Sequence, residues 1–526
     1  MTINFIPNDP NARDSIDMRQ QPARPDRPAG RADFNFEQHN VENPYEFGTR
    51  DFLFWQSREA ALAAVEAWEG FAGDLARWAD RSDDPSRIDL SPVFDDGRTF
   101  GPQRLNAYYD GQGVRFFDFD NGTETIFSGN STDTVSHEVG HALLDSQRPE
   151  LFGSLVPEEA AFHESFGDCI AILTSLADRA TRVALLRATP DLSAPNFVEA
   201  TSEYLAAAAR KQFGNVAPSL PRRALNSFKW QLPSTLPAGR FQDPPELLSR
   251  EAHSFSRVFT GCFYDLLRAI FTSGDTQDEA ALAAAAVKTG QLLVGAARVA
   301  PASPRFFQAV GRAMVKADEQ QNDGENRERI GKAFADHGVM LGSSAMIAPT
   351  AALAGPSPKV LRTKATLAPS TLADLRERMR TKKGAKLAVR PLEELGKGVA
   401  EVVHRREIPL GSIDKRLRGV VAIQSEPVLV GSSGARAALL GALPEMNRTE
   451  DEVGAFVETL LANDRIAMGA QASALAGPSD KDEAPQPYTH VVRSVGGKKV
   501  LTRVRFLCGC GCGGAPEGKL SWSRSP

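Results

Sequence analysis

The chain has 526 residues, of which 42% are hydrophobic and 24% charged, and its formal net charge is -5. This composition is that of a globular protein with a sizeable core, and the length predicts two to four domains. The slightly negative charge argues against general nucleic-acid binding, and the lack of about 18 consecutive apolar residues argues against a membrane span. Five cysteines are too few for a disulfide scaffold. Because residues 1–20 contain no apolar leader, we expect a cytoplasmic protein.

The first elements are predicted from hydrophobic spacing. Residues 1–45 are rich in Pro, Arg, Asp and Asn and are expected to form a disordered arm, because they offer little apolar surface to bury. Residues 51–79 place apolar side chains at helical spacing and predict a helix. Two short strands are expected around the Gly-containing turn at 110–113, followed by a third strand at 125–127.

Two further helices carry the polar residues that matter most. Ser131 or Thr132 is suited to cap a helix over the segment that follows, because a side-chain oxygen at that position accepts a backbone N–H. Pro157, followed by Glu158 and Glu159, predicts the start of a second helix, since proline and acids are favoured in a first turn.

The rest of the chain is divided by its composition. Residues 195–340 are alanine-rich and mostly helical in pattern, and residues 343–370 have the Ala/Pro/Ser composition of a linker. Residues 371–526 form a separate C-terminal region of unknown function, with a hairpin pattern near its end. Within 359–418 there are 16 Lys and Arg against 7 Asp and Glu, which indicates either a solvated face or a docking surface for an acidic partner.

The sequence His137-Glu138-Val-Gly-His141 indicates a metal site. On a helix, residues four apart share a face, so both imidazoles can bind one zinc ion. Glu138 lies about a hundred degrees around the helix and can approach a water on that ion as a general base, as in zinc hydrolases with this spacing.

A catalytic zinc needs a third protein ligand and an open position. The pattern with a third His on the same segment is excluded, because positions 144 and 147 are Leu and Gln. Glu164 on the second helix is the main candidate, and Asp168, four residues later on the same face, could accept a hydrogen bond from a ligand imidazole. Three competing ligands remain open: Glu158, Glu159 and His163.

The pair HEVGH and HESFGD resembles the thermolysin-like gluzincins, a family of zinc metallopeptidases. Further segments resemble the family in the same order and extend the similarity over roughly 50–342: 105–111, 133–137, 141–145, His253 with its helix, and 333–341. The resemblance implies that residues 46–342 form the peptidase domain. It also implies an α+β fold with two lobes: a mostly antiparallel N-terminal sheet packed on the active-site helix, and a helical C-terminal lobe.

The resemblance further implies an endopeptidase that acts on peptide or protein substrates. One zinc would be held by the residues of the two motifs, with Asp168 behind them: His137, His141 and Glu164. Glu138 would act as general base and His253 as oxyanion stabiliser. Asn106 and Ala107 would pair with the substrate backbone as an edge strand.

The sequence also departs from the family. The segment after the second motif, 169–182, is largely apolar, so structural calcium is not expected although Asp133 remains. The family's tyrosine between the two motifs is absent, which leaves more of the oxyanion stabilisation to His253. Without a propeptide, control is expected to come from the C-terminal region. Two alternatives remain open: a catalytically silent binding or scaffold protein, and a zinc hydrolase of a non-peptide acyl bond.

The cysteines divide into two groups. Cys508, Cys510 and Cys512 alternate with glycine near the end of the chain and indicate either a flexible thiol-bearing tail or a site for a soft metal. Cys169 and Cys262 lie in apolar helical segments and are expected to be packed as small hydrophobic side chains.

Overall fold

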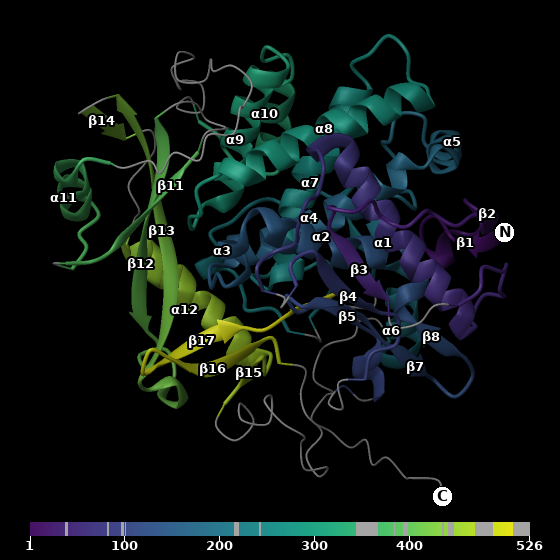
Figure 1. Ribbon diagram of the computed structural model, residues 1–526, viewed down its shortest axis with the longest axis horizontal. Coiled ribbons are helices and arrows are strands. Elements are labelled where there is room, and N and C mark those ends of the chain that lie inside the picture. Colours follow the sequence, from purple (N-terminus) through teal and green to yellow (C-terminus); the bar gives the residue numbers. More distant parts are fainter. Residues whose placement is uncertain are drawn as a thin grey trace, which may run out of the picture.

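The computed structural model describes residues 1–36, 40–81, 84–95, 99, 101–214, 220–240, 243–342, 367–382, 384–392, 398–433, 436–439, 446–468 and 488–508. Helices and sheets are mixed throughout this part of the chain (Figure 1), so the expected α+β class is confirmed.

The described residues of the N-terminal arm, 1–36 and 40–45, are ordered and include three strands, so the prediction of a disordered arm is wrong. Their strands are β1 (Thr2–Phe5), β2 (Arg19–Pro22) and β3 (Asp33–Phe36). The few apolar side chains are placed so that each is used: Ile3, Phe5 and Phe34 are at most 2% exposed. Arginines of the arm also pair with acids of helix α1, as Arg24 does with the buried Glu59 at 3.1 Å. Composition alone missed this order because it ignores where the few apolar residues stand.

The sheet beside the candidate site has the strand order β18-β5-β6-β4-β3. Its further strands are β4 (Arg87–Ser91), β5 (Ala107–Tyr109), β6 (Gly113–Phe116) and β18 (Phe506–Leu507). The expected mostly antiparallel sheet is instead mixed, because β3, β4 and β6 run parallel. A parallel pair needs a long crossover, which α1 supplies between β3 and β4. Sequence analysis missed the crossover because it assigned β3 to a disordered arm.

Helices make up most of the remaining core. Those that surround the candidate site and form the central bundle are α1 (Arg50–Ala72), α2 (Thr132–Gln147), α4 (Pro157–Ala177), α7 (Ala252–Phe271), α8 (Glu279–Val299), α9 (Phe306–Gln321) and α10 (Arg327–Asp336). Smaller elements are α3 (Pro149–Phe152), α5 (Arg179–Ala188), α6 (Glu203–Phe213), β7 (Asp118–Asp120), β8 (Thr125–Phe127), β9 (Ala200–Thr201) and β10 (Arg222–Arg223). The predicted helices after Ser131 and from Pro157 are confirmed, and the helix predicted over 51–79 is present but ends at Ala72, where Gly73 follows with a positive φ. Among the described helices, α8 is long and apolar enough to cross a membrane, a property shared by core helices, and 56% of its apolar window is buried inside the molecule.

The C-terminal region forms a second sheet with two helices. Its elements are α11 (Pro369–Arg378), β11 (Leu387–Pro391), β12 (Val399–Pro409), β13 (Val420–Ser433), β14 (Arg436–Leu439), α12 (Met446–Ala462), β15 (Ile466–Ala467), β16 (His490–Val495) and β17 (Lys498–Arg503). Its apolar residues share one cluster with Leu155, Val156 and Ala160 at the start of α4. From β17 the chain continues to β18, which joins the first sheet beside β5 (Figure 1). This region therefore packs directly against the part that carries the candidate site.

The folded arm predicts a stability effect at Phe5. Phe5→Ala should lower the free energy of unfolding by about 3–5 kcal/mol, because it opens a cavity in a packed core. Val41→Ala is the matched control, since Val41 belongs to the same arm but is 70% exposed, and it should change stability by less than about 0.5 kcal/mol. Urea denaturation measures both; equal, small effects would mean that the arm is not part of the fold.

Candidate active site

Helix α2 carries His137, Glu138 and His141 on a segment that is anchored at its first turn. Ser131 caps the helix by accepting the Thr134 N–H, as predicted. Ahead of it, the backbone N–H of Thr132 donates to the carbonyl of Asn8 at 2.7 Å. The N-terminal arm therefore holds the start of the helix in place.

Two glycines allow α2 and α4 to approach closely. A Cβ built on Gly140 would lie 2.8 Å from Gly167 Cα, and one built on Gly167 would lie 2.6 Å from His137 Nδ1. Real Cβ atoms do not tolerate such contacts, so each position requires glycine. The close approach brings Glu164 of α4 against the imidazoles of α2.

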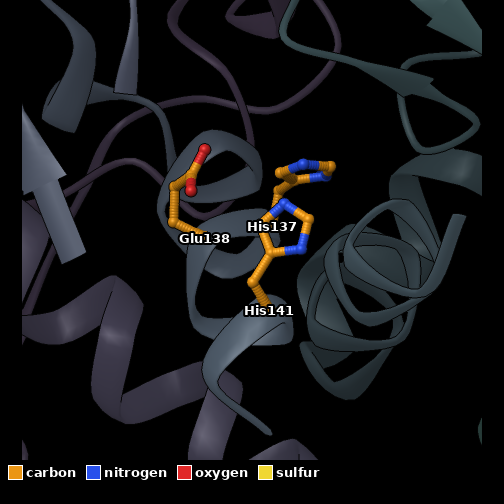
Figure 2. Close-up of side chains that lie close together, drawn as sticks. All are labelled: His137, Glu138 and His141. Carbon is orange, nitrogen blue, oxygen red and sulfur yellow. The ribbon is translucent and has the colours of Figure 1, made fainter. Parts of the chain in front are cut away.

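The side chains of the two motifs converge on one point. Glu164 Oε2 lies 3.4 Å from His137 Nε2 and 3.7 Å from His141 Nε2. Ligands of a tetrahedral zinc at about 2.1 Å are about 3.4 Å apart, so these separations suit a zinc ion. Glu138 is adjacent on α2 (Figure 2), and its carboxylate, His137 and His141 have ligand atoms within 4.8 Å of one another.

The atoms at this point fit a cation chemically as well. His137 Nε2, His141 Nε2 and Glu164 Oε2 are buried and have no hydrogen-bond partner among the described residues. Buried polar atoms without partners are rare and costly in folded proteins. Two imidazole nitrogens and a carboxylate oxygen are a donor set that zinc prefers, so these three residues could hold the ion.

Asp168 and Arg222 orient His137 from behind. His137 Nδ1 lies 2.9 Å from Asp168 Oδ1, so its other nitrogen is left to face the centre. Arg222 Nη2 donates to the same Asp168 oxygen at 2.7 Å. Burial alone would raise the pKa of Asp168, but the charge of Arg222 and the hydrogen bond from His137 lower it to about 2. Arg222 could not be predicted from the sequence, because it stands in no motif and reaches the site only through the tertiary fold.

Electrostatics favour a positive charge at this centre. Burial opposes charge on His137, but the adjacent carboxylates of Asp168 and Glu164 raise its pKa to about 10. Burial lowers the pKa of His141 to about 3. For Glu164, burial would raise the pKa, yet the charges of His253 and His141 hold it well below its usual value. His137 thus keeps a proton between the carboxylates of Asp168 and Glu164. A bound divalent cation would displace that proton.

Glu138 stands apart from this hydrogen-bond network. It is fully buried, and neither of its carboxylate oxygens has a hydrogen-bond partner among the described residues. Burial first, and the nearby Cys508 next, raise its pKa well above the usual value.

His253 reaches the centre from the start of α7. Glu251 caps this helix by accepting the N–H groups of His253 and Ser254, and its Oε1 lies 2.8 Å from His253 Nδ1. The other ring nitrogen, Nε2, is 3.1 Å from Glu164 Oε2 and donates to the Leu507 carbonyl at 2.7 Å. Burial would lower the pKa of His253, but the charges of Glu164 and Glu251 raise it well above its usual value.

The expected substrate-binding edge is also beside the centre. Ala107 belongs to β5 and its carbonyl accepts the Cys508 N–H at 2.9 Å. The Asn106 side chain turns back to accept the Ala107 N–H at 2.9 Å. The outer edge of β5 is therefore paired with the chain's own C-terminal segment.

The competing ligands lie outside the centre. His163 Nδ1 is 3.4 Å from the outer nitrogen of His141, Nδ1, so it stands behind that imidazole. Glu158 accepts the Trp230 indole N–H and the Phe307 backbone N–H, both at 2.9 Å. Glu159 lies near Gln424 of the C-terminal region, at 3.4 Å.

The expectation that structural calcium is absent stays a prediction, whereas the expectations for the cysteines are decided in part. Asp133 accepts the Ser202 N–H at 2.8 Å and the Ser131 hydroxyl, so it ties α2 to the segment before α6. Cys169 and Cys262 are buried in the core as expected. Cys508 is fully buried too, which contradicts the expectation of a flexible tail at that position; positions 510 and 512 lie outside the described residues.

Comparison with known proteins supports a peptidase-like site. Residues 238–345 match the family model described as fungalysin metallopeptidase (M36). The matched segment contains α7 with His253, and continues through α8, α9 and α10. It does not include α2 or α4, so the match and the convergence of His137, His141 and Glu164 are separate observations. No curated protein matches the chain.

The distances predict which acid binds the metal. Glu164→Gln should abolish stoichiometric zinc binding, because it removes the anionic oxygen that lies 3.4 Å from His137 Nε2. Glu138→Gln, a change of the same chemistry on the neighbouring helix, should leave about one zinc per chain. Metal analysis after dialysis measures both. Loss of zinc in Glu138→Gln with retention in Glu164→Gln would reverse the assignment.

Proposed function

We propose that the protein is a zinc-dependent endopeptidase that hydrolyses peptide bonds. One observation carries the proposal: three buried ligand atoms, which lack hydrogen-bond partners in the described part of the chain, converge from His137, His141 and Glu164. The match of residues 238–345 to a metallopeptidase family supports it from a different part of the sequence.

In this proposal His137, His141 and Glu164 bind the metal through one atom each. A three-ligand site leaves one position open, as catalytic zinc requires. Zinc bound there supplies a Lewis acid that polarises a carbonyl and makes water more acidic. Asp168, itself paired with Arg222, keeps the proton of His137 on the nitrogen that faces away from the metal.

Glu138 is the general base. Its carboxylate stands next to the ligands but is not committed to a hydrogen bond with any described residue, so it is free to accept a proton from the attacking water. It then passes that proton to the leaving amine, which restores the carboxylate.

His253 donates a hydrogen bond from Nε2 to the oxyanion that forms on the substrate carbonyl. Two features support this role: Glu251 holds the opposite nitrogen at 2.8 Å, and Nε2 already donates to a carbonyl oxygen at 2.7 Å. A donor that is oriented before the reaction costs no reorganisation when charge develops. Ala107 would offer main-chain hydrogen bonds to an extended peptide in the place that residues 506–508 take in this structure.

A digest of a peptide library with and without a chelator tests the proposed function. The zinc-loaded full chain should cleave peptides, the chelated chain should not, and Glu138→Gln should lose activity by several orders of magnitude while keeping its zinc. Hydrolysis of acyl esters without peptides would instead identify a non-peptide hydrolase. A chain that hydrolyses neither substrate would be a binding or scaffold protein.

His253→Ala should lower kcat for peptide hydrolysis by about 10²–10³, the usual effect of removing one oxyanion donor. KM and zinc content should change little, because the bond is made mainly in the transition state. Glu251→Gln is the matched comparison: it keeps the shape of the cap but removes the charge, and its effect on kcat should be smaller. A near-normal kcat in His253→Ala would mean that another group stabilises the oxyanion.

A further inference from the structure

The outer edge of β5 carries an extended segment from the end of the same chain. In the antiparallel ladder Phe506 pairs with Tyr109 and Leu507 with Tyr108. Figure 1 shows this segment leaving β17 and ending beside β5. An extended peptide added to an exposed edge is a common mode of substrate binding, and here the peptide is residues 506–508.

The Leu507 carbonyl lies where the proposed mechanism needs a substrate carbonyl. It accepts from His253 Nε2 at 2.7 Å. The same nitrogen is 3.1 Å from Glu164 Oε2, an atom of the candidate metal centre. One imidazole nitrogen thus connects this carbonyl to the centre.

The next residue is held on both sides of its backbone. The Cys508 N–H donates to the Ala107 carbonyl at 2.9 Å, and the Cys508 carbonyl accepts from Arg222 Nη1 at 2.8 Å. Before the bond, the Phe506 ring stacks on His163 and His141, with centroid distances of 4.2 and 4.8 Å. The Leu507–Cys508 peptide bond is therefore fixed by contacts in both directions along the chain.

The Cys508 thiol has contacts of its own, near Ser202 and Glu138. Its Sγ lies 3.5 Å from the Ser202 hydroxyl, and the Ser202 N–H is bonded to Asp133 in the first turn of α2. The thiol therefore packs near the start of α2, one turn before His137. The group that faces His253 is the peptide bond.

We propose that the first substrate of this site is the chain's own C-terminal segment, cut within one molecule at the Leu507–Cys508 bond. The inference rests on the proposed function. Water adds its oxygen to the Leu507 carbonyl carbon, and the C–N bond to Cys508 breaks. Leu507 becomes a carboxylate, Cys508 acquires a free amino group, and the protons of the water balance the two; residues 508–526 are released.

Two consequences follow from this arrangement. A second peptide cannot add to β5 while residues 506–508 pair with it, so the segment keeps other substrates out. The cut removes the Cys508 N–H from the Ala107 carbonyl, and Phe506 and Leu507 then leave β5 by unpairing. Water can reach the bond, because a cavity of about 570 Å³ borders Glu164, His253 and Leu507 and is large enough to hold water molecules.

Adding zinc to the metal-free full chain tests the proposal by intact-mass analysis. The mass should fall to that of residues 1–507, with a first-order rate that does not depend on protein concentration. The Glu138→Gln chain should keep its full mass, even when it is mixed with the active chain. Cleavage of the Glu138→Gln chain by the active one, or a rate that rises with concentration, would overturn cleavage within one molecule.

Substitutions at Cys508 separate the peptide bond from the thiol. Cys508→Ser keeps the N–H and should be cut within about threefold of the wild-type rate, whereas Cys508→Pro lacks the N–H that Ala107 accepts and should stay intact. Should Cys508→Ser instead turn an inert, intact chain into an active peptidase, the thiol would be the inhibiting group and the proposal would be wrong.

A readout that needs neither zinc nor catalysis is the alkylation of Cys508. In the metal-free Glu138→Gln chain, the buried thiol should react at least tenfold more slowly than in urea; equal rates would mean that the segment does not lie in the site.

Added peptides separate the self-cleavage proposal from the proposed function. An intact chain that still hydrolyses peptides overturns self-cleavage alone. The proposed function is overturned as well if the full chain cuts neither itself nor peptides, and if a chain that ends at Arg505, in which β5 is open, also cuts no peptides.

Discussion

The candidate site depends on the close approach of α2 and α4 at Gly140 and Gly167. A methyl group on Gly167 would fall 2.6 Å from His137 Nδ1, and one on Gly140 would fall 2.8 Å from the facing backbone. Only at this separation does Glu164 lie 3.4 Å from His137 Nε2. The metal-ligand geometry is therefore set by the packing of two backbones. The side chains that meet there inherit a spacing that zinc tolerates within a few tenths of an ångström.

The charges around the centre serve two purposes at once. Buried carboxylates such as Glu164 and Asp168 are tolerable only when cations pair with them, and His253 and Arg222 supply that pairing at 3.1 and 2.7 Å. The same two cations donate to the carbonyls of Leu507 and Cys508. The two side chains that neutralise the buried acids, His253 and Arg222, are thus also the side chains that donate hydrogen bonds to a peptide backbone. Loss of either cation would disturb the centre and its peptide contact together.

Much of the centre could be predicted from the sequence because it lies on helices. The four-residue spacing fixed His137 and His141 on one face, and the same spacing put Asp168 behind Glu164 on α4. Resemblance to a known family supplied His253 and the edge at Ala107, which helical geometry alone could not bring to the site. Arg222 was missed because it stands on a two-residue strand, β10, whose position depends entirely on tertiary contacts.

The errors in the fold have one common origin. Residues 1–45 were judged by composition, yet a few well-placed apolar residues, among them Phe5 and Phe34, are enough to fold them onto α1. A disordered arm leaves no place for β3 in the predicted sheet. The prediction therefore omitted the parallel pairing of β3 with β4. The pairing of β18 with β5 spans almost 400 residues of sequence, and no local pattern encodes such a contact.

Both distant parts of the chain meet on the same helix and sheet. Ile6 and Asn8 accept hydrogen bonds from Thr132 at the start of α2, while residues 506–508 close the edge of β5. Contacts of such sequence separation form late, because the loop entropy must be overcome first. The metal ligands come from α2 and α4, and residues 506–508 lie against them in the folded chain, so a peptide covers the centre once folding is complete. Cutting at Leu507–Cys508 would then release the Cys508 N–H from the Ala107 carbonyl without disturbing the N-terminal contacts that hold α2.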